Sequence, residues 1–121
     1  MEILGKILVA LVALEHLYIL YLEMFAWETK GKEVFKGSLA PEMFRPTKTL
    51  AANQGLYNGF LAAGLIWSLF ITDHHWSFYI AIFFLTCIIV AGIYGAVTAS
   101  KKIFFVQALP AIVALVVLHI R

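Results

Sequence analysis

Apolar positions in this chain fall into four long stretches, and most charged positions lie in the connections between them. The stretches run over about residues 3–27, 49–72, 76–99 and 103–120. Each has the roughly 20 mostly apolar residues that a helix needs to cross a bilayer. Because the backbone must satisfy its own hydrogen bonds inside lipid, we predict helices for all four. The predicted fold is all-α, a membrane bundle of four transmembrane helices that forms a single integral membrane domain over residues 1–121.

The composition supports this interpretation. Of the 121 residues, 63% are hydrophobic and 13% are charged, whereas soluble domains are about 45–50% apolar and about 25% charged. The spans leave no room for a separate soluble domain. The single cysteine, Cys87, excludes a disulfide within the chain and is expected to be a small packing residue.

The connections predict an orientation in the membrane. A longer loop over residues 28–48 joins the first two helices, and short turns at 73–75 and 100–102 join the others. The long loop and the last turn face the same side and share seven basic residues: Lys30, Lys32, Lys36, Arg45, Lys48, Lys101 and Lys102. The other side has Lys6 and Arg121. Because basic loops stay on the cytoplasmic side, we predict a cytoplasmic long loop and both termini outside, in the cytoplasmic (inner) membrane.

Three ionisable side chains interrupt the first apolar stretch. Glu15 and His16 are adjacent near its centre, and Glu23 follows seven residues after His16. His16 and Glu23 are about 20° apart around a helix, with Glu15 beside them. A charged side chain at the bilayer centre costs about 2.5–3.5 kcal/mol, so such groups face the protein interior and mark functional sites.

Polar side chains on the other helices lie at a similar depth, in the half of the bundle nearest the long loop. They are Asn53, Gln54, Tyr57 and Asn58 on the second helix, Tyr94 on the third and Gln107 on the fourth. Unpaired amides in hydrocarbon are costly. We therefore expect one shared inner-leaflet polar pocket, with Glu23 near Asn53 or Gln54, and Glu15 and His16 near Asn58.

Three functions fit this pattern. In the favoured one, the pocket binds or acts on a small lipophilic molecule, with Glu15 and His16 as the catalytic pair and the other polar side chains as ligand contacts. A proton-coupled small-molecule exporter that works as a dimer is the second, and a non-catalytic structural or partner-binding subunit is the third. Whether the protein is an enzyme stays open. The polar groups could also act only as hydrogen-bonding contacts between helices.

Other features narrow the chemistry. Glu15, His16 and Glu23 lack a repeated metal-ligand spacing, and the histidines near residues 73–75 and 119 are typical of a solvated turn, so we predict no metal site. The cofactor is left unknown. The chain has no phosphate-binding glycine loop and no basic-aromatic surface for nucleic acid.

Small residues and one proline affect packing. Small residues at helical spacing permit close helix contacts, either within the chain or in a homo-oligomer. Those considered for an interface between copies are Gly55, Gly59, Gly92 and Ala96. Pro110 lies inside the fourth stretch and predicts a kink there.

Four segments together resemble a known family. They are LVALEHLYILYLEMFAW, LAANQGLYNGFLAAGLIW, IVAGIYGA and VQALP. In this combination the chain is similar to a family of small bacterial integral-membrane proteins of unknown function. The resemblance covers nearly the whole chain and implies a four-helix membrane protein, but it implies no activity.

Overall fold

The computed structural model describes residues 1–120 and is all-α over that range, apart from one isolated bridge between Lys36 and Leu39. The elements are α1 (Ile3–Phe25), α2 (Lys30–Val34), the 3-10 turn η1 (Pro41–Met43), α3 (Lys48–Phe70), α4 (His74–Thr98), α5 (Lys101–Ile103), the π-helical turn η2 (Phe104–Ala108) and α6 (Leu109–Ile120). α5, η2 and α6 follow one another without a break and form one final rod. Arg121, which the orientation argument included, lies outside the described residues.

Three segments of the described chain are long and apolar enough to cross a membrane: Ile3–Phe25, His74–Thr98 and Lys101–Ile120. These correspond to the first, third and fourth predicted spans. The second predicted span, α3, has the same 23-residue length as α1. It is less apolar because Asn53, Gln54 and Asn58 lie in its first half.

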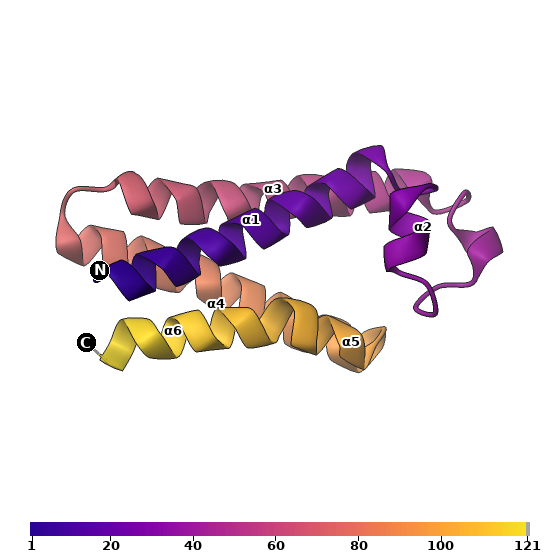
Figure 1. The fold of residues 1–121 in the computed structure, drawn as a ribbon. Helices are drawn as coiled ribbons and strands as arrows, with labels where there is room; N and C mark the ends of the chain where they lie inside the picture. Colours follow the sequence, from indigo (N-terminus) through magenta and orange to yellow (C-terminus); the bar gives the residue numbers. More distant parts are fainter. Residues whose placement is uncertain (121) are drawn as a thin grey trace.

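The long helices pack around a shared core. α1 packs on α3, α3 on α4, and α6 on both α4 and α1. The hydrophobic core between them includes Val9, Val12, Ala13, Leu65, Ala81, Leu85, Ile88, Ala111 and Ala114. The start of α1, the end of α6 and the α3–α4 turn lie at one end, here called the terminal end, while α2 and the α4–α5 turn lie at the other, the loop end (Figure 1).

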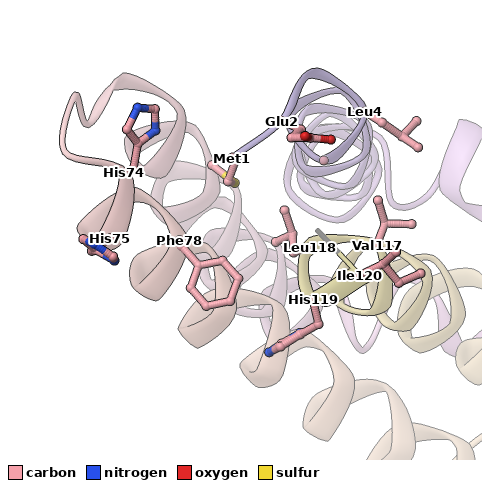
Figure 2. Close-up of a pocket in the computed structure, with 11 residues that line it drawn as sticks. Met1, Glu2, Leu4, His74, His75, Phe78, Val117, Leu118, His119 and Ile120 are labelled. Carbon is pink, nitrogen blue, oxygen red and sulfur yellow. The ribbon is translucent and has the colours of Figure 1, made fainter.

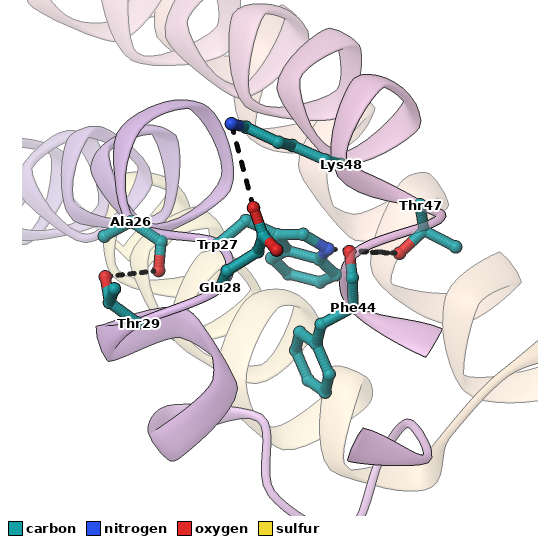
Figure 3. A network of polar contacts seen from close by, with 7 residues as sticks. All are labelled: Ala26, Trp27, Glu28, Thr29, Phe44, Thr47 and Lys48. Atoms are coloured by element: carbon teal, nitrogen blue, oxygen red, sulfur yellow. Dashed lines mark hydrogen bonds and ion pairs between the residues drawn. The ribbon is translucent and has the colours of Figure 1, made fainter. Parts of the chain in front are cut away.

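The connection between α1 and α3 is folded rather than an open loop. The Trp27 ring lies 4.8 Å from the Phe44 ring and 5.6 Å from the Phe35 ring, centre to centre. Trp27 Nε1 donates a hydrogen bond to Thr47 Oγ1 at 3.1 Å, and Phe44 and Thr47 lie in the segment between η1 and α3 (Figure 3). The sequence predicted only a loop here. α2 is five residues long, and so short a helix is stabilised by tertiary contacts rather than by its own sequence.

The final rod contains a π-helical turn where the sequence predicted a kink. The Leu109 N–H donates to the Phe104 carbonyl, five residues earlier instead of four. Pro110 follows directly and has no N–H to donate, so a regular α-helical ladder cannot pass through this point. The π turn changes the direction in which the following side chains project.

Glycines set the distance between neighbouring helices. A Cβ atom at Gly55 would lie 2.6 Å from Met24 Cγ, and one at Gly59 would lie 2.6 Å from Leu20 Cδ1. α1 therefore packs directly against this face of α3. Small residues on one helix and longer side chains on the other fix the register of the pair.

Candidate functional site

His16 is the most deeply buried ionisable group of α1, with no exposed surface. Its Nδ1 lies 2.9 Å from the Val12 carbonyl oxygen, one turn back on the same helix. Because a carbonyl can only accept, Nδ1 carries the proton and donates this bond. The Nε2 atom is then an acceptor, and Gln107 Nε2 lies 3.4 Å from it and donates. Both ring nitrogens of the neutral imidazole therefore have partners.

The π turn is what brings Gln107 to His16. Gln107 lies within η2, in the residues before Pro110. α1 and the final rod are far apart in the sequence, and this contact links them across 91 positions. π-helical turns occur frequently at functional sites, because they redirect one side chain without breaking the helix.

Glu23 is paired with a different residue from the one predicted. Its Oε1 accepts a hydrogen bond of 2.7 Å from Asn58 Nδ2, and Glu23 is 8% exposed. The sequence placed Glu23 near Asn53 or Gln54, and placed Asn58 near Glu15 and His16. That register was wrong by about one helical turn. The packing of α1 on the glycine face of α3 sets the actual register, with the backbone of Gly55 facing Glu23 Cβ.

Glu15 differs from the other two groups because its carboxyl group lacks a partner. Its Oε1 atom is buried and accepts no hydrogen bond from the described residues. The nearest basic atom is His16 Nδ1 at 3.9 Å, but that nitrogen already donates to Val12. The Glu15 side chain is 28% exposed, so it lies at the edge of the packed interior.

Four other predicted site residues do not join these contacts. Asn53, Gln54, Tyr57 and Tyr94 are exposed on the outer surface of α3 and α4. The shared pocket therefore does not form as expected. α3 instead buries its small residues, including Ala51, Gly55, Ala62 and Ser68. The face of α3 that carries its amides was expected to point inward. Small side chains occupy the inward face instead, because they allow closer helix packing than amides do.

Two buried polar residues were not identified from the sequence. Ser77 Oγ donates to the Ser68 carbonyl at 2.7 Å, and Ser68 Oγ donates to the Leu65 carbonyl at 2.6 Å. Both serines lie close to the short α3–α4 turn and satisfy backbone carbonyls there. A serine in an apolar helix commonly bonds to its own backbone, so the sequence held no signal for a contact between helices.

Metal ligands do not converge in the described part of the chain. Over residues 1–120, no group of three or more His, Cys, Asp or Glu side chains could hold a metal ion. Glu15, His16 and Glu23 are instead divided among separate contacts. What they can do chemically is accept or donate hydrogen bonds within an apolar environment.

Comparison with known proteins identifies relatives but no activity. Residues 10–119 match the family model described as "Protein of unknown function (DUF1304)". The uncharacterized protein YpaA of Lactococcus lactis subsp. lactis (strain IL1403) is 40% identical over 117 residues, which is 96% of this chain and 97% of that protein. An uncharacterized protein of Haemophilus influenzae (strain ATCC 51907 / DSM 11121 / KW20 / Rd) is 73% identical over 31 residues, 26% of this chain and 39% of that one. No solved structure matches.

Proposed function

This chain belongs to the DUF1304 family of proteins of unknown function, and we propose that it is a multi-pass protein of the cytoplasmic membrane that binds a small lipophilic molecule through Glu15. The observation that carries the proposal is the buried Glu15 oxygen without a hydrogen-bond partner among the described residues. A buried polar atom left without a partner costs about 1–3 kcal/mol. A ligand that donates a hydrogen bond to it would recover that cost.

Membrane insertion is supported by the outer surface of the helices. Ile3, Phe25, Phe70 and Val97 are each more than 70% exposed. Exposed apolar surface on this scale is unfavourable in water and favourable in lipid. We propose α3 as a fourth span. It packs on α1, its exposed amides Asn53 and Gln54 lie near the loop end, and Asn58 is bonded to Glu23.

The same arrangement supports a cytoplasmic loop end. Seven basic residues belong to the segments gathered there (Figure 1). Lys6 is the basic residue near the terminal end among the described residues. The bias toward one end agrees with the rule that cytoplasmic connections are rich in Lys and Arg.

In this proposal the ligand donates and Glu15 accepts. A carboxylate has only acceptor atoms, so its partner carries an amine, ammonium, amide or hydroxyl group. His16 is a positioning residue rather than a proton donor, because Val12 and Gln107 occupy both of its ring nitrogens. Its contact with Gln107 holds the final rod against α1 beside Glu15.

A proton-coupled exporter is the second candidate, and the partial exposure of Glu15 favours it. A carboxylate at the edge of the interior can exchange a proton for a cationic substrate. An exporter of this size would function as an assembly. An interface through Gly55, Gly59, Gly92 and Ala96 remains a prediction, although Gly55 and Gly59 already pack on α1 and Gly92 on Ala108.

The test is ligand retention by the purified full chain in mild detergent. Native mass spectrometry, with dodecylamine as an added lipophilic donor, compares the wild type with Glu15→Gln. We expect an adduct on the wild type and at least a tenfold loss in Glu15→Gln, at similar thermal stability. Glu42→Gln, an exposed change in the long loop, is the matched control and should keep the adduct.

Equal retention by Glu15→Gln and the wild type would reject Glu15 as the binding group. Substrate-dependent proton release by a dimeric protein would instead support the exporter. If the Glu15→Gln variant keeps the adduct but loses thermal stability, Glu15 has a structural role.

A further inference from the structure

A cavity of about 600 Å³ opens at the terminal end, where α1 and α4 begin and α6 ends (Figure 2). Its size is within the range of small-molecule sites, about 300–1,000 Å³. Most of its lining residues are apolar and include Leu4, Phe78 and Val117, while the polar ones include His74, His75 and His119. The cavity is far from Glu15 and separate from the site described above.

Its position relative to the bilayer is defined by the helices that end there. Each of the three segments apolar enough to span a membrane has one end at this cavity. Trp76, beside the histidines, is 60% exposed. Tryptophan is typical of the membrane–water boundary. The cavity therefore lies where a lipid headgroup meets its acyl chains.

The hydrogen bonding of His119 leaves one ring nitrogen for a ligand. His119 Nδ1 donates to the Leu115 carbonyl at 2.8 Å. In the neutral ring Nε2 can then only accept, and it becomes a donor only when the imidazole is protonated. The Phe78 ring lies 5.3 Å from the His119 ring, edge-on. Figure 2 shows Phe78 with His75 on one side and His119 on the other.

The acidic groups of this region are already engaged. The Asp73 carboxylate accepts from the backbone N–H groups of His75 and Trp76, both at 3.0 Å. Those bonds, led by the one from Trp76, hold the pKa of Asp73 below its usual range. Asp73 thus stays charged at any pH near neutrality. Glu2 has an interaction of its own.

We propose that this cavity binds an anionic phospholipid, with an acyl chain against Leu4, Phe78 and Val117 and the headgroup among His74, His75 and His119. The apolar lining fits a hydrocarbon chain and excludes a wholly polar ligand. Three imidazoles are among the residues that line the cavity, and protonation converts an imidazole into a cation with two N–H donors. The protonated imidazoles therefore bind an anionic headgroup more strongly than the neutral ones.

The test is the binding of defined lipids to the full chain, counted by native mass spectrometry at pH 5.5 and pH 8. Histidine is the side chain whose charge ordinarily changes in this interval. Among residues 1–120, the other charged groups at or next to the cavity are the Met1 amino group, Glu2 and Asp73. We expect dioleoylphosphatidylglycerol to bind about fivefold more tightly per added charge at pH 5.5, since a cationic side chain near anionic lipid contributes about 1 kcal/mol. Zwitterionic dioleoylphosphatidylcholine should show no such change.

Two variants separate this cavity from the basic loop end, which also attracts anionic lipid. A His74→Gln, His75→Gln, His119→Gln triple variant should lose the pH-dependent binding and keep the part that does not vary with pH. Leu4→Trp, which fills the cavity from an exposed position, should lower phosphatidylglycerol binding at both pH values. The proposal is rejected if the triple variant keeps the pH dependence, if phosphatidylcholine shows the same dependence, or if Leu4→Trp binds as the wild type does.

Discussion

At the scale of single residues, the buried polar groups of α1 are satisfied in separate pairs. His16 is bonded to Val12 and Gln107, and Glu23 is bonded to Asn58. Each pair also joins α1 to another helix, so each contributes to packing. Glu15 is the exception, because its buried oxygen lacks a partner among the described residues. The difference between satisfied and unsatisfied groups is what separates structural residues from a candidate ligand contact.

Replacing Asn58 tests the Glu23 pair. We expect Asn58→Leu to destabilise the protein by roughly 1–3 kcal/mol, because it leaves the Glu23 carboxyl group buried without its donor. Thermal unfolding in detergent measures the loss. The control is Asn53→Leu on the same helix, which removes an exposed amide and should have little effect.

The double variant Glu23→Leu, Asn58→Leu should recover much of that stability, since neither partner is then left alone. An Asn53→Leu variant as unstable as Asn58→Leu would contradict the assignment. So would a double variant less stable than Asn58→Leu alone.

At the scale of elements, close backbone contacts determine how the helices fit. A Cβ atom at Gly92 would lie 2.7 Å from Ala108 Cβ and 2.8 Å from Ala108 N. These are backbone and near-backbone atoms of η2, and they cannot move without separating the final rod from α4. The absence of a side chain at Gly92 therefore allows the π turn to pack closely on α4, and this packing holds Gln107 toward His16.

Adding one methyl group tests this contact. We expect Gly92→Ala to lower stability by about 1–3 kcal/mol, the usual cost of overpacking. Gly59→Ala is the matched control, because its Cβ would meet only side-chain atoms of Leu20, the nearest being Cδ1 at the end of that flexible side chain. Alanine also gains about 0.8–1.0 kcal/mol of helix propensity over glycine, so Gly59→Ala should be nearly neutral. Thermal unfolding of the two variants measures their stabilities. Equal losses of stability in Gly92→Ala and Gly59→Ala would contradict a specific role for the Gly92–Ala108 contact.

At the scale of the whole molecule, the two ends differ in charge and in structure. The loop end carries most of the basic residues and the folded connection around Trp27. Lys102 Nζ donates to the Val34 carbonyl at 3.2 Å and ties the final rod to α2. The terminal end carries the histidine-lined cavity. These differences are the basis of the membrane orientation that we propose.

Thiol labelling in intact cells tests that orientation. On a Cys87→Ser background, we expect Ser38→Cys in the long loop to be protected from an impermeant thiol reagent, because basic loops remain in the cytoplasm. His74→Cys at the terminal end should react. Both positions are exposed, so the reagent reaches them differently only if they lie on opposite sides of the membrane. Labelling of Ser38→Cys with protection of His74→Cys would reverse the proposed topology.

The sequence by itself predicted an all-α chain with helices apolar enough for a membrane, and the positions of its long helices. Hydrophobic stretches of this length admit few structures other than helices, since lipid offers the backbone no hydrogen bonds. The ends of all four predicted helices agree with the structure to within a few residues, and the family resemblance is confirmed. The same pattern singled out Glu15, His16, Glu23, Asn58 and Gln107, and also the exposed residues Asn53, Gln54, Tyr57 and Tyr94, because polar residues within an apolar stretch need partners.

Only the tertiary structure decided which of those residues meet. Helical periodicity gives the face on which a side chain lies, but not the register between two helices, and here the glycines of α3 shifted it by about one turn. The π turn before Pro110 breaks the periodicity that would have placed Gln107. The folded connection around Trp27 and the cavity at the terminal end depend on residues far apart in the chain. Contacts of this kind arise from packing, and packing follows from the shapes of several helices together rather than from the polarity of one.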